Sequence, residues 1–430
     1  MPKRSCQVGS SSSIEATAIP TWSIRVNIVR RIGAIASGVL LRWHDRPVEA
    51  RVPLSTVLRD WGRLGLTGFG GPPAHVAMLR ELCVERNHWI EPQEFEDANA
   101  ACGLLPGPAS TQLAIYCAQR VAGRAGAVVG GLAFIVPGLV MIIALAAIFL
   151  ASAPPAWLRG VGAGAGAAVL AVVLRVGWDL ARASLAPHAG FRLWRAALYI
   201  AIGAAVTILF GAWVVAALLG CGLVELLIRR GSREAAALSP AMLLLAATGA
   251  AAIPALAWTA FKVGALSYGG GFVIVPIMQQ DAVEVYGWMT EPQFLNAVAL
   301  GQITPGPVVQ TVAVVGYAAA GVGGALLASF VAFAPSMLIV IAGGSRFLQL
   351  RRNPNARAFL DGAGPAAIGA IFGAFVPLAA GVDFTWQWVV AAVAALLLFA
   401  ARLGVVPTLL LAAAAGAVAA IAGLPVPASA

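Results

Sequence analysis

Apolar runs of about 17 to 25 residues follow one another along almost the whole chain after about residue 55. A helix of this length can cross the ~30 Å hydrocarbon core of a bilayer. Because 60% of the residues are hydrophobic and 11% are charged, a water-soluble globule would expose large apolar surfaces. A membrane β-barrel would instead show short alternating segments. The sequence therefore predicts an all-α polytopic membrane protein with about 13 transmembrane helices (range 11–13).

The positive charge has a topological explanation. The net charge of +10 comes from 28 Lys and Arg that lie mostly in short loops, where they orient helices toward the cytoplasm. We therefore expect no nucleic-acid partner. The basic residues 1–55 are predicted to be a cytoplasmic arm with an interfacial helix. The five cysteines lack metal-ligand spacing, so we expect no metal and no cofactor.

The most informative feature is an internal repeat with an offset of 199 residues. Between residues 65 and 108, thirteen of 44 positions are identical to their counterparts, without a gap. The identical pairs include Gly65 with Gly264 and Trp89 with Trp288. We therefore expect a first repeat at 56–237, a linking span at 238–258 and a second repeat at 259–430.

The distribution of arginines predicts that the two repeats have opposite orientations. In the first repeat, the loop after the Pro-Gly-Pro span carries Arg120 and Arg124. In the second repeat that loop has no basic residue, and the following loop carries Arg346, Arg351 and Arg352. Since Lys and Arg favour the cytoplasmic side, the pattern predicts an inverted-topology repeat. The N-terminus would be cytoplasmic and the C-terminus periplasmic, in a bacterial inner membrane.

Each repeat contains a Pro-Gly-Pro triplet, which interrupts a helix because proline removes a backbone donor and clashes with the preceding turn. Such a break inside a membrane must be buried in protein or line an aqueous cavity. The helix that restarts offers free N–H groups and a positive dipole end to an anion. A packed kink is the alternative reading. The candidate substrate-binding residues here are Pro106, Gly107, Pro108, Ser110, Thr111, Gln112, Pro305, Gly306, Pro307, Gln310 and Thr311.

A glycine cluster marks a second break in each repeat, where backbone and ligand can approach closely. Five or six residues before each cluster stands a lone cation, which within a membrane span is a candidate for function. Snorkelling to the interface is an equally good explanation of these cations. The candidates from this pair of segments are Arg63, Phe69, Gly70, Gly71, Lys262, Tyr268, Gly269 and Gly270.

Glu85 and Glu284 are the matched carboxylates of the repeat, and they are the candidates for proton coupling. The alternative is that both are solvated loop residues beside interfacial tryptophans. His75 has no histidine counterpart in the second repeat, and we interpret it as a packing or surface residue.

The motifs Phe69-Gly-Gly-Pro72 with Leu105-Pro-Gly-Pro108, and Tyr268-Gly-Gly-Gly271 with Thr304-Pro-Gly-Pro307, resemble the chromate ion transporter family in its long, two-domain form. The resemblance spans roughly residues 55 to 425. It implies two homologous halves and export of chromate from the cytoplasm driven by the proton motive force, which confers chromate resistance. Sulfate is the analogous oxyanion. The N-terminal arm lies outside the resemblance.

We therefore expect a secondary transporter of an inorganic oxyanion, with protons as the coupling ion and the bilayer as its surroundings. Uptake of sulfate or a related oxyanion is the alternative within transport. An enzyme is not expected, because the spans show no nucleophile, metal set or matched acid/base pair. A membrane subunit or sensor is a further alternative, and a homo-oligomer stays open.

Overall fold

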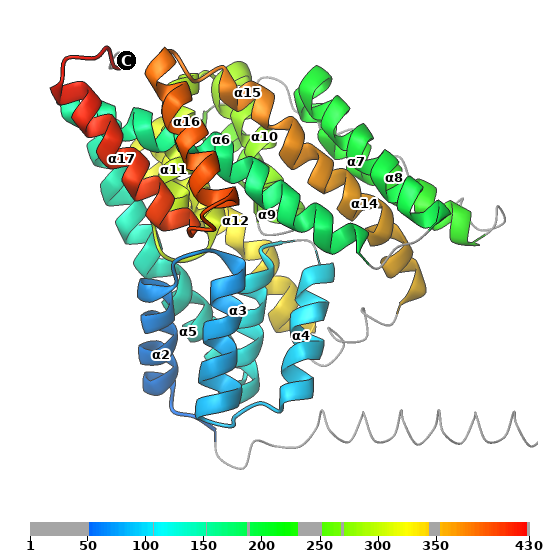
Figure 1. The fold of residues 1–430 in the computed structure, drawn as a ribbon. Coiled ribbons are helices and arrows are strands. Elements are labelled where there is room, and N and C mark those ends of the chain that lie inside the picture. Colours follow the sequence, from blue (N-terminus) through cyan, green and yellow to red (C-terminus); the bar gives the residue numbers. More distant parts are fainter. Residues whose placement is uncertain are drawn as a thin grey trace, which may run out of the picture. The chain divides into compact units, whose positions relative to one another are not determined.

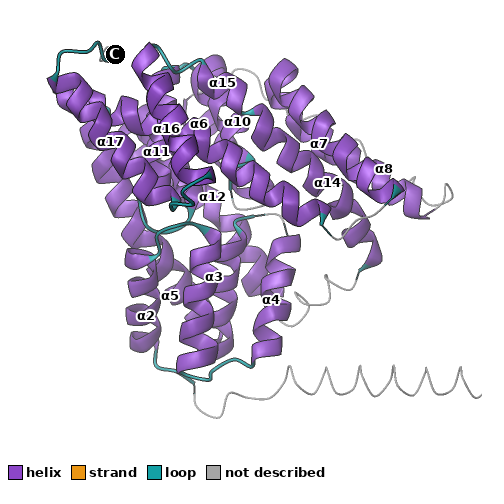
Figure 2. Ribbon diagram, in the orientation of Figure 1, coloured by secondary structure: helices purple, strands orange, loops and turns teal. Residues whose placement is uncertain are grey.

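The computed structural model describes residues 51–105, 107–151, 153–186, 190–230, 252–267, 271–343 and 353–427. Within these ranges the chain is helical and has no strand (Figures 1 and 2). Residues 1–50 are not among them, so most of the predicted arm lies outside the described residues. The predicted linking span also falls largely outside them, because residues 231–251 are not described.

The first half begins with short helices. They are α2 (Leu54–Thr67), α3 (Pro72–Arg80), its π-helical continuation η1 (Glu81–Arg86) and α4 (Pro92–Leu104). Prolines at the first positions of α3 and α4 fix these starts, since proline suits the first helical turn. α2 and α4, with 14 and 13 residues, are about 20 Å long and too short to cross a bilayer core alone.

The next helix, α5 (Ala109–Phe149), reverses direction at Gly123, whose φ is 70°. A Cβ atom on Gly126 would lie 2.5 Å from the carbonyl oxygen of Ala118, and one on Gly131 would lie 3.1 Å from Ile115. In a straight helix these residues would be far apart, so α5 is a tight hairpin of two helices. The longer helices α6 (Ala156–Leu185), α7 (Phe191–Phe210) and α8 (Val214–Arg230) follow, with a short 3₁₀ turn η2 (Gly211–Trp213) before α8.

The second half repeats this order. Its elements are α9 (Ala252–Leu266), α10 (Ile274–Gln279), the π-helix η5 (Gln280–Val285), α11 (Glu291–Ile303), η6 (Val308–Gln310), α12 (Thr311–Gly343), α14 (Pro354–Gly373), α15 (Phe375–Ala379), α16 (Thr385–Phe399) and α17 (Val405–Ile421). η1 and η5, like α4 and α11, match residue for residue at the offset of 199. α12 also folds back on itself, at Ala320 and Gly321. The α2 counterpart, α9, begins inside the predicted linking span.

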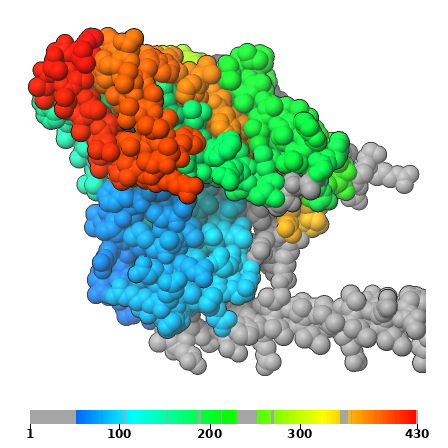
Figure 3. Space-filling view, in the orientation of Figure 1, coloured from blue at the N-terminus to red at the C-terminus, as the bar shows by residue number. Residues whose placement is uncertain are grey.

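The long helices of the two halves are exchanged. α6 of the first half packs along α16 and α17 of the second, and α14 of the second half packs along α7 and α8 of the first. Figure 3 shows α14 and α15, in orange, beside the green α7 and α8. These contacts use glycines: a Cβ on Gly160 would meet Gly416, and one on Gly203 would meet Ala366. Small residues let membrane helices approach closely, as they do here.

The outer surface is apolar. Trp194 is 76% exposed, and Leu209, Phe330 and Ile421 are exposed to a similar degree. Among the described helices, five are long and apolar enough to cross a membrane, and three shorter ones are also apolar. Such a surface suits hydrocarbon rather than water. The chain is an all-α polytopic membrane protein whose helices are broken at the predicted motifs.

Candidate functional site

Each half has two breaks, and glycines with positive φ mark them. The first break separates α2 from α3, where Gly70 and Gly71 have φ of 100° and 74°. The second separates α4 from α5, where Gly107 has φ of 118°. In the second half, Gly271 (φ 95°) and Gly306 (φ 99°) mark the corresponding segments. These left-handed conformations are available to glycine and strained for other residues.

The breaks of the two halves are bonded to each other. The N–H of Gly107 donates to the carbonyl of Ser267 at 2.8 Å, and the N–H of Gly306 donates to the carbonyl of Gly68 at 3.0 Å. Gly68 and Ser267 are equivalent residues of the repeat, so the two bonds are reciprocal. We call the segments 68–71, 105–108, 267–271 and 304–307 the loop crossing. Within it, Pro106, Tyr268, Gly269 and Gly270 lie outside the described residues.

The predicted polar residues beside the loop crossing are buried: Ser110, Thr111, Gln112, Gln310 and Thr311. Two of them reach across to the other half. The Gln310 side chain donates to the carbonyl of Ile135 on α5 at 2.7 Å, and the Gln112 side chain lies 3.4 Å from the Ser336 hydroxyl on α12. The structure therefore brings together the Pro-Gly-Pro segments and their polar neighbours from both halves.

Several buried polar atoms near the loop crossing lack a hydrogen-bond partner among the described residues. They are the hydroxyl oxygens of Thr111 and Ser267 and the side-chain oxygen of Gln310. Leaving a buried polar atom unpaired costs about 1–3 kcal/mol, so such atoms usually meet water or a ligand. Two hydroxyl donors beside a helix N-terminus form a suitable environment for an oxyanion.

His75, which we interpreted from the sequence as a packing or surface residue, is buried beside the loop crossing. Its Nε2 lies 2.9 Å from the carbonyl of Gly68, the same oxygen that accepts from Gly306. A carbonyl only accepts, so Nε2 carries a proton here. Nδ1 lies 3.2 Å from the Ser110 hydroxyl, and Phe134 packs edge-on against the ring. The sequence signal for His75 was its place four residues after the Gly-Gly pair. The absence of a histidine at the equivalent position of the second half argued against a functional role.

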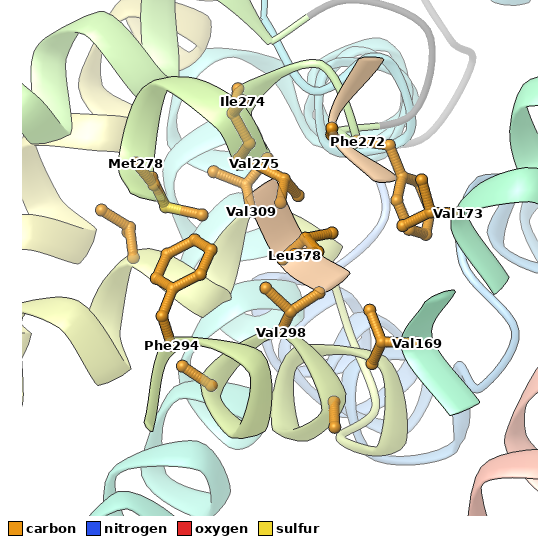
Figure 4. Packing of buried hydrophobic residues seen from close by; sticks show 14 of the residues in the cluster. Val169, Val173, Phe272, Ile274, Val275, Met278, Phe294, Val298, Val309 and Leu378 are labelled. Carbon is orange, nitrogen blue, oxygen red and sulfur yellow. The ribbon is translucent and has the colours of Figure 1, made fainter. Parts of the chain in front are cut away.

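The two sides of the loop crossing differ in polarity. At the positions equivalent to His75 and Ser110, the second half has Ile274 and Val309. Figure 4 shows these two among buried apolar side chains of α6, α10, α11 and α15, with Phe272 nearby. The polar groups that could hold an anion therefore come mainly from the first-half side.

Within the described ranges, no ion pair or side-chain hydrogen bond joins either candidate cation to a residue of the loop crossing, although Lys262 lies five residues before Ser267. Arg63 lies near the end of α2 with an exposed side chain. The Lys262 ammonium lies 2.5 Å from the carboxylate of Asp281, so its charge is already paired. Phe69 is exposed. The position in the first half that is equivalent to Asp281 is a leucine. A comparison of identical residues in the two halves therefore could not single out this buried carboxylate.

The proton-coupling candidates Glu85 and Glu284 are both exposed. Glu85 lies 13 residues beyond the start of α3, which places it about 20 Å along the helix from the first glycine break. It pairs with Arg80 at 3.3 Å and is 60% exposed. This environment matches the alternative reading, in which these residues are solvated.

The described residues contain no group of His, Cys, Asp and Glu side chains that could hold a metal ion. Cys83, Cys102, Cys117 and Cys221 are free and buried.

Comparison with known proteins identifies the family. A family model described as chromate transporter matches residues 55–226 and 254–420. The chain is 34% identical over 332 residues to the chromate transport protein of Cupriavidus metallidurans, a match covering 74% of this chain and 80% of that protein. It is 32% identical over 327 residues to a probable chromate transport protein of Synechococcus elongatus, with 74% and 82% covered. No solved structure matches it. The chain, with its duplicated breaks joined at one crossing, belongs to the chromate transporter family.

Proposed function

We propose that this protein carries chromate across the bacterial inner membrane and exports it from the cytoplasm, driven by the proton motive force, so that it confers chromate resistance. Membership of the family and relatives named chromate transport proteins support the substrate. The reciprocal bonds of Gly107 and Gly306 carry the placement of the site. Each bond joins the segment that precedes an anion-compatible helix start in one half to the glycine segment of the other half.

The proposed substrate site is the loop crossing with its polar neighbours. Chromate is a tetrahedral dianion, which needs several donors arranged around it. The hydroxyls of Thr111 and Ser267 and the N-terminal N–H groups of α5 supply donors without a fixed counter-charge, whereas the Ser110 hydroxyl donates to Nδ1 of His75. Arg63 and Lys262 act outside this inner set in our proposal, since one is exposed and the other is paired with Asp281.

Transport requires the site to open alternately to each side of the membrane. We propose that the two repeats have inverted topology, with the N-terminus in the cytoplasm and the C-terminus in the periplasm. The arginine distribution supports this orientation. In the view of Figure 1, α3 and α4 extend below the connecting loops while α10 and α11 lie above them, which is consistent with opposed repeats. Rocking of one half against the other would then expose the crossing to each side in turn.

The test is the chromate content of cells that express the chain, compared with an empty-vector control, with a protonophore in a parallel sample. Export predicts a lower content of labelled chromate, and the protonophore should abolish the difference. Sulfate uptake is the alternative function, because sulfate has the same shape and charge. Unchanged chromate with raised sulfate content would establish the alternative and contradict export.

A variant pair tests the site in the same assay. Thr111→Val removes a buried hydroxyl that has no partner among the described residues, whereas Thr408→Val removes one that donates to the carbonyl of Gly404, directly before the same helix. We expect Thr111→Val to raise the KM for chromate about tenfold, consistent with the loss of a hydrogen bond to a charged group. Thr408→Val should leave KM unchanged. Equal KM values for both variants would move the site away from Thr111.

A further inference from the structure

An ion pair is buried in the second half, on the elements that lead to the loop crossing. Asp281 in η5 is 7% exposed and Lys262 in α9 is 19% exposed, with 2.5 Å between the carboxylate oxygen and the ammonium nitrogen. The hydroxyl of Thr259 donates to the same carboxylate oxygen at 2.6 Å. The Lys262 ammonium also lies 5.9 Å from the centre of the Trp258 ring. The carboxylate is thus held by two groups of α9.

The first half folds without this pair. At the position of Lys262 it has the exposed Arg63, and at the position of Asp281 it has the buried Leu82. The equivalent helices α2 and η1 therefore form without a salt bridge at these two positions. Burying two charges costs several kcal/mol of desolvation per ion, and an ionisable residue inside a membrane protein commonly marks function. The pair is thus a feature of one half that packing alone does not explain.

The pair lies close to the loop crossing. Lys262 precedes Ser267 by five residues, about 7 Å along α9, and the Ser267 carbonyl accepts the bond from Gly107. Asp281 lies in a π-helix, a geometry that recurs at functional sites. The helix that carries Lys262 and Thr259 therefore ends at the residue that accepts one of the two reciprocal backbone bonds of the loop crossing.

We propose that Asp281 is the group that binds and releases the coupling proton. The inference rests on the proposed proton-driven transport and replaces Glu85 and Glu284 as its carriers. A proton taken up on one side of the membrane converts the carboxylate to a carboxylic acid and ends its ion pair with Lys262. Release of that proton on the other side restores the pair. α9 is held against η5 in the ionised state and is free to move in the protonated state.

Few other titratable groups face Asp281 among the described residues. Tyr286, directly after η5, interacts with it electrostatically, and its ring stacks on Trp288. Glu284 lies on the same π-helix but is exposed. Within the described part of the chain, Lys262 is the one cation paired with Asp281. The protonation of Asp281 therefore decides whether the charge of Lys262 is compensated.

The test uses the full chain in liposomes, with two rates measured for each variant. The first is chromate transport with and without a pH gradient, and the second is chromate exchange at equal pH on both sides. We expect Asp281→Asn to exchange chromate but to transport it at the same rate with and without the gradient. Asp281→Glu should keep the acceleration by the gradient, because it keeps a carboxyl group. Glu284→Gln, the matched change on the same π-helix, should behave as wild type.

Three results would overturn the inference. They are acceleration by the gradient in Asp281→Asn, loss of acceleration in Glu284→Gln, and loss of exchange together with net transport in both Asp281 variants. The last result would make the pair a purely structural link. Sulfate transport is measured in parallel. If the wild-type protein carries sulfate and not chromate, the proposed substrate is wrong, and the same variants are then compared with sulfate to test the role of Asp281. A wild type that carries neither ion contradicts both proposals.

Discussion

Gly107 and Gly306 occupy equivalent positions, with φ of 118° and 99°, but their surroundings differ. A Cβ atom on Gly107 would lie 2.5 Å from the side-chain nitrogen of Gln112 and would also collide with the Ser336 hydroxyl. On Gly306 the nearest atoms would be those of Gln310, at 3.5 Å. Backbone strain is therefore common to both sites, whereas steric crowding affects one.

We expect Gly107→Ala to lower stability and transport more than Gly306→Ala does. Strain at positive φ costs about 1–2 kcal/mol in each variant, and the collision with Gln112 adds to it in the first. The measurement is the apparent melting temperature in detergent, together with the chromate transport rate. Gly103→Ala, where a Cβ meets nothing within 4 Å, is the control. Equal losses of melting temperature and transport rate in the two variants would show that backbone strain, and not the collision with Gln112, causes the effect.

Residue type and spacing predicted the loop crossing's glycines and prolines, because backbone restrictions are local properties of the chain. His75 and Asp281 were not candidates from the sequence for one reason: each breaks the symmetry of the repeat. Their importance comes from the neighbours Gly68 and Lys262, which only the fold brings to them.

At the scale of elements, two features define the fold: short helices flank the breaks, and the longer helices pack closely against one another. The sequence predicted that spans would be broken at the glycine and Pro-Gly-Pro motifs, and the structure confirms broken helices there. The π-helices η1 and η5 were not predicted, since a π turn has no simple sequence signal. Close contacts between helices occur at glycines, and the sequence alone does not reveal which helix packs against each glycine.

Gly416→Leu should disrupt the packing of α17 on α6. A Cβ atom at this position already meets the Gly160 carbonyl and lies 2.9 Å from the Cα atom of Gly164. A larger side chain must push the helices apart, at a cost of about 1–3 kcal/mol or more. The apparent melting temperature should fall, whereas Gly220→Leu in α8, with open space around the glycine, should leave it unchanged. Equal melting temperatures for both variants would contradict this packing.

At the scale of the whole molecule, the halves depend on each other. α6 packs on α16 and α17, α14 packs on α7 and α8, and Arg229 of α8 pairs with Asp361 of α14 at 2.8 Å. The polar residues beside the crossing are buried, so in our proposal substrate enters when the halves move relative to each other.

Residues 1–237 and 238–430, produced as two polypeptides, should assemble when expressed together and be unstable when expressed alone. Each half alone exposes the surfaces of α6 or α14 that the other half covers. Co-purification through a tag on one fragment, followed by chromate transport, measures assembly. Gly416→Leu in the second fragment should weaken it. A fragment 1–237 that is monodisperse and stable alone would contradict the exchanged arrangement.

The sequence by itself determined the membrane class, the repeat and the positions of the breaks, because hydrophobicity, duplication and the restrictions of proline and glycine are encoded locally. The tertiary structure alone decided that each break bonds to the other half, that α6 and α14 exchange partners, and that His75 and Asp281 lie against Gly68 and Lys262. These contacts join residues far apart in the chain, and apolar helices of similar composition can pack in many pairings. Close packing selects one of them.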